Sequence, residues 1–518
     1  MRVWRWLPAV LGATYLVLVL VHLSTMVAYA YGNSDFASGP VIGELLGQAP
    51  AGREVTLGGL PWFSTLFFEM LTKPLPWHRQ IWEGAPYVAS LAAIAVLAWT
   101  VCGIAGTWAA SVTAAVLVAA SPYYVTRYLF AFDNHTTTWI VCVIMGAWLV
   151  AVTRGGRWAG RRALVAMIVV LALFAGVNAA SDILLFVAGL APLVIAAVGT
   201  RWRGTATFAD PVVRAVIAVA VGAIAVAVIT TAVMHANGIR GGDNGLAFIG
   251  VDQFDHALVS LWQGIAALGS GDFFGRPIGP GGLLRFAAGM ATFAAAAVPI
   301  VLGVRWVRGR SIDRPSAALP ADTHILYWGA AALLSVLGYL FSNRAGGLGE
   351  NRYLIGVLFA AAATLPLITR RALVTAWASV IALAGVAALP ELFKFPSYPP
   401  SPSVAQQIAG IARDHGMHVG YAGYWDSAGV MWATNFGVLV YPVEQCNPGP
   451  AVCWFNLHRI SSWYTPRPRT PTFFLVDPQS GIAPQPDPAF GTPAFSTQIG
   501  KLTMYGYDHD IARELRPK

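Results

Sequence analysis

The stretch LPAVLGATYLVLVLVHLSTMVAYA, residues 7–30, runs for 24 positions without an acidic residue, a lysine or an arginine. A helix needs about 20 consecutive apolar residues to cross the hydrocarbon core of a bilayer. The apolar part of a secretory signal peptide is shorter, roughly 7–15 residues. We therefore expect this stretch to be a retained membrane-spanning helix, and the alternative is a signal peptide cleaved after the AYA at 28–30.

The composition of the whole chain is that of a membrane protein. Of its 518 residues, 56% are hydrophobic and 11% are charged, whereas soluble domains carry about 25% charged residues. We expect a polytopic α-helical membrane protein with about eleven transmembrane helices and a small C-terminal α/β extracytoplasmic domain. The hydrophobic runs that predict these helices are 8–30, 86–102, 108–123, 137–152, 163–178, 183–199, 212–234, 283–303, 324–342, 353–369 and 373–390.

Arginines in the short loops predict the orientation of these helices. Cytoplasmic loops of membrane proteins are enriched in Lys and Arg, so the net charge of +9 does not indicate a nucleic-acid partner. With the N-terminus in the cytoplasm, the arginine clusters all fall on one side, at 154–162, 201–203, 305–314 and 370–371. We expect a multi-pass protein of the plasma (inner) membrane, with its N-terminus cytoplasmic and its C-terminal domain extracytoplasmic.

A change of composition predicts the domain boundary. The Pro/Ser stretch PSYPPSPS, 396–403, reads as a linker, so we expect a transmembrane domain over 1–395 and a soluble α/β domain over 396–518. Within the latter, 403–416 is typical of a helix, and 417–423, 436–443 and 472–478 are typical of strands. Cys446 and Cys453 flank a Pro/Gly loop and are expected to form a disulfide in an oxidising compartment.

Four segments on the predicted outer side concentrate ionisable residues. Charged groups near the hydrocarbon are costly, and segments that leave the membrane at one level can converge. Each residue also has an ordinary explanation, such as a solvated loop, a helix cap or an arginine that reaches the lipid headgroups. The residues are Asp35 and Glu44; Arg127, Asp133 and His135; Asp182; and Arg344, Glu350 and Arg352.

Carboxylates and arginines together suit the transfer of a sugar from a lipid phosphate. A carboxylate can take the proton of an acceptor hydroxyl, and we expect Asp35 to be this base. Arginine binds phosphate through two parallel hydrogen bonds. The expected ligands of the donor phosphate are Arg352, Arg344 and Arg127. The remaining polar residues are expected to surround a sugar or a divalent cation (Mg²⁺, Mn²⁺ or Ca²⁺); they are Asp133, His135, Asp182 and Glu44.

This layout resembles the GT-C superfamily, membrane glycosyltransferases that use polyprenyl-phosphate sugars. NSDF (33–36) matches the place of the family's catalytic Asp, FAFDNHTTT (130–138) its second acidic loop, and NRYL (351–354) the Arg-Tyr at a late helix start. The resemblance implies an inverting enzyme of arabinofuranosyl- or mannosyltransferase type, with a cell-envelope glycan, glycolipid or protein as acceptor. The first loop has one Asp where the family has an adjacent acidic pair, which leaves metal dependence open.

Aromatic residues add two expectations and leave alternatives open. The stretch 60–87 is typical of amphipathic helices lying on a membrane, with Leu71, Trp77 and Trp82 among its anchors. In the C-terminal domain, Tyr424 and Trp425 suit stacking on an acceptor glycan, although core packing explains them equally well. The alternative functions are a transporter or flippase for a lipid-linked precursor and a structural envelope protein. No Walker motif, dinucleotide fingerprint or zinc spacing occurs in the sequence, which argues against an ATP-driven pump and a soluble cofactor enzyme.

Overall fold

The chain divides into two compact units, which we call the helical unit and the mixed unit. The helical unit comprises Met1–Leu23, Ala85–Thr231 and Gly245–Lys394, and the mixed unit comprises Ser24–Gly84, Ala232–Asn244 and Phe395–Lys518. The computed structural model describes residues 3–47, 54–58, 62–125, 129, 135–155, 161–202, 206–241, 245–309, 319–346, 348–392, 401–478 and 484–517.

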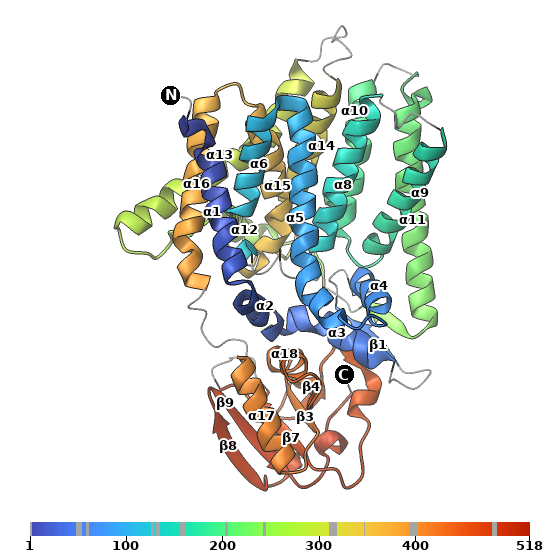
Figure 1. The fold of residues 1–518 in the computed structure, drawn as a ribbon. Coiled ribbons are helices and arrows are strands. Elements are labelled where there is room, and N and C mark those ends of the chain that lie inside the picture. The colour runs from blue at the N-terminus through green and yellow to red at the C-terminus, as the bar shows by residue number, and fades with distance from the viewer. Residues whose placement is uncertain are drawn as a thin grey trace. The chain divides into compact units, whose positions relative to one another are not determined.

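Each hydrophobic run predicted from the sequence overlaps a helix, but the first run, 8–30, is divided at His22 into α1 and α2 (Leu23–Gly32), so the expected single span over 7–30 was too long. Helix α1 packs against α6 and α16, and α14 packs against α8, α10 and α13 (Figure 1). The bounds are α1 Leu7–Val21, α5 His78–Ala105, α6 Thr107–Val118, α8 Thr136–Thr153, α9 Arg161–Ala179, α10 Ala191–Arg201, α11 Pro211–Ala236, α12 Phe254–Leu268, α13 Pro280–Arg308, α14 Leu319–Phe341, α15 Ile355–Thr364 and α16 Arg371–Leu392.

The polytopic helical class is confirmed in its coarse form. Within the described residues, eight helices are long and apolar enough to cross a membrane. Three of the eleven predicted spans correspond to shorter helices, Thr107–Val118, Phe186–Arg201 and Ile355–Thr364. The first of these ends at Val118 and the last passes into a 3₁₀ turn at Leu365–Leu367. The number of eleven spans therefore stays a prediction.

Apolar side chains on the outer faces of these helices indicate a bilayer environment. On α9, Val170 is 62% exposed and Phe174 is 52% exposed, and on α11, Val228 is 64% exposed. Many exposed large apolar side chains on one helix are unfavourable in water, but they match lipid chains. The two helices can approach closely because position 176 is a glycine: a Cβ there would lie 2.6 Å from the Ala223 carbonyl oxygen. Small residues are typical of helix contacts in membranes.

The mixed unit contains a six-stranded sheet of order β5-β4-β3-β7-β9-β8. Strands β4, β3 and β7 are parallel, and the outer strands are antiparallel. Helices α17 (Pro402–Asp414) and α18 (Ala428–Ala433) pack together on the sheet (Figure 1). The strands are β3 Val419–Gly423, β4 Leu439–Gln445, β5 Val452–Trp454, β7 Thr472–Val476, β8 Phe495–Ile499 and β9 Leu502–Tyr507.

The three predicted strand segments overlap β3, β4 and β7, and the predicted helix overlaps α17. Strand β5 and the β8–β9 hairpin were not predicted from the sequence. Phe495, Thr497 and Ile499 alternate with polar residues before the turn at Gly500, where φ is +61°. This alternation is a strand signal that could have been recognised. Cys446 and Cys453 are joined by a disulfide, with their Cα atoms 5.2 Å apart.

A second sheet joins three distant parts of the chain within the mixed unit. Strand β1 (Val55–Leu57) pairs in parallel with β2 (Ile239–Gly241) and antiparallel with β6 (Arg459–Ile460). The first loop therefore folds with the C-terminal region. The first loop, residues 31–85, contributes α3 (Ser34–Leu46) and α4 (Trp62–Thr72), whereas α2 (Leu23–Gly32) comes mostly from the end of the first hydrophobic run. The division of the chain into 1–395 and 396–518 stays a prediction.

The stretch 60–87 behaves only partly as an interfacial segment. Leu71 and Trp77 are exposed, as expected of membrane anchors. Trp82 is not exposed, because its side chain is fully buried and its ring meets Phe68 edge-on at 5.0 Å. Its backbone oxygen also accepts a hydrogen bond from the Tyr31 hydroxyl at 2.5 Å. The expectation that Trp82 is an anchor was therefore wrong, since this residue belongs to the core of the mixed unit.

Candidate functional site

Asp35 lies in the first turn of α3 and is only 7% exposed. Asn33 caps this helix, and its side-chain oxygen accepts a hydrogen bond from the Asp35 backbone N–H at 2.9 Å. The extended backbone of Asn33 and its short amide side chain suit this position. Because the N-terminus of a helix carries a partial positive charge, it favours a carboxylate here.

Tyr424 of the C-terminal region holds the Asp35 carboxylate. The Tyr424 hydroxyl donates to Asp35 Oδ1 at 2.9 Å. The Tyr424 ring stacks on Phe455 at 4.9 Å and on His458 at 5.0 Å, and Trp425 packs edge-on against it at 5.1 Å. Burial lowers the pKa of His458 to about 3, so this imidazole is neutral. The result is a buried acid beside a stack of aromatic rings.

The topology of the sheet puts Tyr424 where α/β proteins bind ligands. Strand β3 lies between β4 and β7, so the chain changes direction across the sheet between β3 and β7. Ligands of such folds bind outside the carboxyl ends of the strands at this point. Tyr424, Trp425 and Asp426 follow β3 directly, and Asp477 follows β7.

Two acids at this edge were missed by the sequence analysis. Asp426 and Asp477 are 3% and 1% exposed. Burial raises the pKa of Asp426 to about 7; Lys501 opposes this rise and Asp477 adds to it. Lys501 Nζ donates to Asp477 Oδ2 at 2.6 Å. The available signal was their position near the carboxyl ends of two predicted strands, since carboxyl ends of parallel strands meet at one edge.

A close backbone approach keeps α3 near α18. A Cβ on Gly429 would lie 2.0 Å from the carbonyl oxygen of Gly32, the residue before the Asn33 cap. A glycine is therefore required at position 429 for this approach. It holds the beginning of α3, and with it Asp35, at its position beside Tyr424.

In the helical unit, a second buried polar cluster forms around Asp182. Asp182 Oδ2 accepts a hydrogen bond from His135 Nδ1 at 2.8 Å and another from the Thr138 hydroxyl. Asn178 Nδ2 donates to Thr138 Oγ1 at 2.7 Å, and Leu184 N donates to Asp182 Oδ1 at 3.0 Å. The last bond is the capping interaction considered from the sequence. The structure thus brings the predicted residues His135 and Asp182 together.

The NRYL segment contacts this cluster through Tyr353. Its ring lies 5.0 Å from the His135 ring, and the Arg352 guanidinium lies 5.2 Å from the Tyr353 ring centre. Arg352 also forms an ion pair with Glu350 at 3.3 Å. Arg344 is partly exposed in the connection that follows α14. Arg352 therefore belongs to the surroundings of the Asp182 cluster.

Other predicted residues fall elsewhere. Arg127 and Asp133 lie outside the described residues. Asp35 and Glu44 belong to the mixed unit, while His135, Asp182 and the two late arginines belong to the helical unit. The convergence of all four segments on one site stays a prediction.

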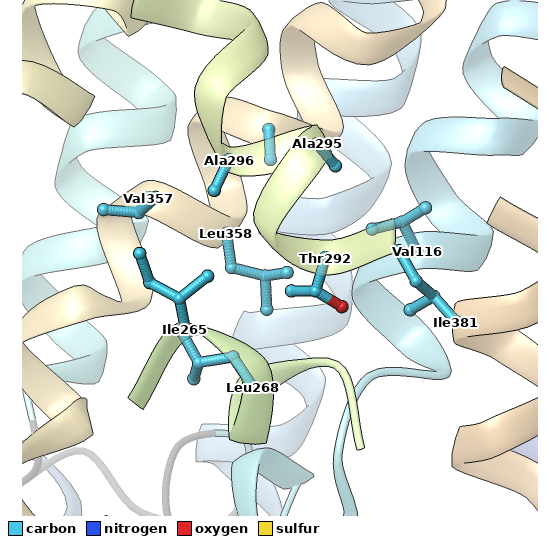
Figure 2. Close-up of a pocket in the computed structure, with 10 residues that line it drawn as sticks. Val116, Ile265, Leu268, Thr292, Ala295, Ala296, Val357, Leu358 and Ile381 are labelled. Atoms are coloured by element: carbon cyan, nitrogen blue, oxygen red, sulfur yellow. The ribbon is translucent and has the colours of Figure 1, made fainter. Parts of the chain in front are cut away.

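A small cavity inside the helical unit carries no polar chemistry. Figure 2 shows Thr292 as the one polar side chain among its lining residues, and Thr292 Oγ1 donates to the Ala288 carbonyl oxygen of its own helix at 2.7 Å. We therefore assign the cavity to packing. The lining residues are Val116, Ile265, Leu268, Thr292, Ala295, Ala296, Val357, Leu358, Ala361 and Ile381.

The comparisons with known proteins give no match. No family model, no curated protein and no solved structure is similar to this chain. Function is therefore inferred from the geometry of the polar groups around Asp35 and around Asp182.

Proposed function

We propose that the protein is an inverting glycosyltransferase of the GT-C type. It moves a sugar of arabinofuranose or mannose type from a polyprenyl-phosphate donor to an envelope glycan, glycolipid or protein acceptor on the outer face of the membrane. The observation that carries the proposal is Asp35. It is a buried carboxylate at a helix N-terminus, held by the Tyr424 hydroxyl at 2.9 Å beside stacked aromatic rings.

Asp35 has the chemistry required of the base. The acceptor hydroxyl oxygen attacks the anomeric carbon, and its proton passes to the Asp35 carboxylate. The bond between the anomeric carbon and the phosphate oxygen breaks on the opposite face, and the lipid phosphate leaves with the electron pair. Tyr424 is a positioning residue, because its hydrogen bond fixes the orientation of the acid. Its aromatic neighbours provide a flat apolar surface, such as one face of a sugar ring prefers.

The leaving phosphate needs cationic or hydrogen-bonding partners. Arg352 is our first candidate, because a guanidinium matches phosphate oxygens in bidentate fashion. Arg344 and Arg127 are the further candidates. Trp425 is the candidate contact for the acceptor glycan, since it is partly exposed beside Tyr424. A donor anchored in the bilayer must be reached at the membrane, in agreement with the apolar helices.

The test uses the full-length protein, purified in detergent and returned to lipid vesicles. Polyprenyl-phosphate arabinose and polyprenyl-phosphate mannose, each with radiolabelled sugar, are offered with envelope glycan acceptors. We expect transfer from one donor, and a loss of about 10²–10⁴-fold in Asp35→Asn, which keeps the shape and removes the base. Glu54→Gln, a change at an exposed acid paired with Arg240, is the control and should retain activity. Transfer by Asp35→Asn at the unchanged rate contradicts the assignment.

A transporter or flippase is the second candidate, and the buried Asp182–His135 pair is the observation that favours it. Ionisable residues inside a helical bundle often mark transport pathways. Both residues lie at helix ends, however, since His135 precedes α8 and Asp182 follows α9. Transporters place such groups near the middle of the membrane. Movement of the labelled lipid across vesicles without sugar transfer would select this alternative.

A further inference from the structure

Three side chains of the first loop meet in the mixed unit, apart from Asp35. They are Glu44 on α3, Glu69 on α4 and His78 at the beginning of α5. Their ligand atoms all lie within 4.8 Å of one another. His78 Nε2 is 4.0 Å from Glu44 Oε2 and 3.9 Å from Glu69 Oε1. We call these three residues the Glu-Glu-His cluster.

Glu69 is the unusual member, because its side chain is only 1% exposed. Among the residues that the structure describes, neither of its carboxylate oxygens has a hydrogen-bond partner, and His78 Nε2 has none either. A buried carboxylate that accepts no hydrogen bond is costly, and the usual remedies are an ion pair, such as that with His78 at 3.9 Å, protonation or a metal ion. Burial raises the pKa of Glu69 to about 7; the nearby Trp82 indole and Lys73 oppose this rise, and the charge of Glu44 adds to it.

The backbone of α3 makes room for this carboxylate. A Cβ on Gly43 would lie 2.1 Å from Glu69 Cγ and 3.2 Å from Glu69 Cδ. Any other residue at position 43 would therefore push the Glu69 side chain away from Glu44 and His78. The glycine allows a buried acid of one helix to stand beside the half-buried acid of the other.

We propose that Glu44, Glu69 and His78 bind a divalent transition-metal ion, of which Mn²⁺ and Zn²⁺ are representatives. Carboxylate oxygens suit Mn²⁺, and imidazole suits Zn²⁺ and its neighbours; both metals accept a mixed set of these ligands. The present spacing leaves space for one ion among three donor atoms. Small side-chain rotations bring these atoms to metal–ligand distances of about 2.0–2.2 Å, and water completes the coordination.

Lys73 offers the competing explanation. Its ammonium lies 3.3 Å from Glu44 Oε2 and 2.8 Å from the Glu44 backbone oxygen. Without a metal, Lys73 neutralises Glu44, and Glu69 has His78 as its charged neighbour. A bound ion takes Glu44 from Lys73 and repels the ammonium. The two explanations therefore differ in the effect of removing the lysine charge. If the cluster is a metal site, the metal affinity rises. If Lys73 is the partner of Glu44, the metal affinity does not rise.

The experiment measures metal binding and does not depend on the proposed glycosyltransferase activity. The full-length protein carries a tag without histidine clusters and is stripped with a chelator. Free Mn²⁺ is followed by electron paramagnetic resonance, and Zn²⁺ by isothermal titration. We expect one ion per chain, with affinity reduced by about 10–100-fold or more in Glu69→Gln and His78→Gln. Glu54→Gln is the matched control and should bind as the native protein does.

Two further variants decide between the explanations. Lys73→Met removes the competing charge, so it should bind the metal more tightly than the native protein. Gly43→Ala displaces Glu69 without altering a ligand, so it should bind more weakly; a size-exclusion profile shows whether each variant is folded. The proposal is overturned if the stripped native protein binds neither metal. It is also overturned if the Glu69→Gln and Glu54→Gln variants bind equally well.

Discussion

At the scale of single residues, Asp35 is held from two sides. Asn33 caps the backbone beside it, and Tyr424 donates to its carboxylate from a position 389 residues further along the chain. The local signal, a cap residue followed by an acid, is visible in the sequence. The tyrosine partner is not, because no sequence spacing relates the two positions.

Replacement of Tyr424 by phenylalanine tests this contact. Tyr424→Phe keeps the stacking on Phe455 and removes one buried hydrogen bond to a charged group. We expect the free energy of unfolding to fall by about 1–3 kcal/mol, and sugar transfer to fall by about tenfold with the donor affinity unchanged. Unfolding and steady-state kinetics provide the measurement. Tyr505→Phe, at a partly exposed residue of β9, is the control. Equal kinetics in Tyr424→Phe and Tyr505→Phe would show that Tyr424 does not position Asp35 for the reaction.

The buried acid Asp426 predicts a dependence of stability on pH. Burial raises its pKa from 3.8 to about 7, so between about pH 4 and pH 7 the folded state holds a proton that the unfolded state releases. Stability therefore decreases as the pH rises through this window. Asp426→Asn cannot ionise, and it should be more stable than the native protein at pH 8, by on the order of 2–4 kcal/mol, with little difference at pH 4.

The measurement for this prediction is unfolding at both pH values. Asp414→Asn, at an exposed position near the end of α17, should follow the native protein throughout. If the free energies of unfolding of Asp426→Asn and the native protein differ equally at pH 4 and pH 8, the difference comes from packing. The predicted link between stability and the protonation of Asp426 is then wrong.

At the scale of elements, α18 and the beginning of α3 fit together through two glycines. Gly429→Ala places a methyl group where the Gly32 carbonyl oxygen now lies. We expect a loss of about 1–3 kcal/mol from overpacking, together with reduced transfer, because Asp35 moves with α3. Thermal unfolding measures the first effect.

A second glycine provides the control for this substitution. Gly410 lies in α17, and a Cβ there would meet no atom within 4 Å. Gly410→Ala should therefore stabilise the protein by about 0.5–1 kcal/mol, as alanine usually does in a helix interior. Destabilisation by both variants to the same extent would show that the close approach at Gly32 does not matter.

At the scale of the whole molecule, the disulfide offers a test of orientation. If the C-terminal region faces the oxidising side, Cys446 and Cys453 are blocked to an impermeant maleimide in intact cells and become reactive after reduction. Cys102 and Cys142 lie in membrane helices and should stay unlabelled. Mass spectrometry of labelled peptides gives the result. Free thiols at 446 and 453 that react only after the cells are opened would reverse the predicted topology.

The sequence by itself determined the polytopic helical class and the positions of the long apolar helices, because a bilayer requires long apolar segments whatever their partners are. It also located β3, β4 and β7, whose apolar runs are buried within the sheet. It missed β8, in which Ser496 and Gln498 face outward, because a half-polar strand is recognised only by alternation. The eight long helices were clear, while short helices such as α6 and α15 left the number of spans open.

Only the tertiary structure decided which polar groups meet. The pair of Asp35 with Tyr424, the pair of His135 with Asp182 and the Glu-Glu-His cluster each join residues from separate elements. These residues come together because helices pack closely at glycines such as Gly43 and Gly429, and because the strand order is β4-β3-β7. Apolar burial depends on local pattern and can be read along a chain. Hydrogen bonds and metal ligation depend on positions within a few ångströms, which the chain reaches only after its elements have packed.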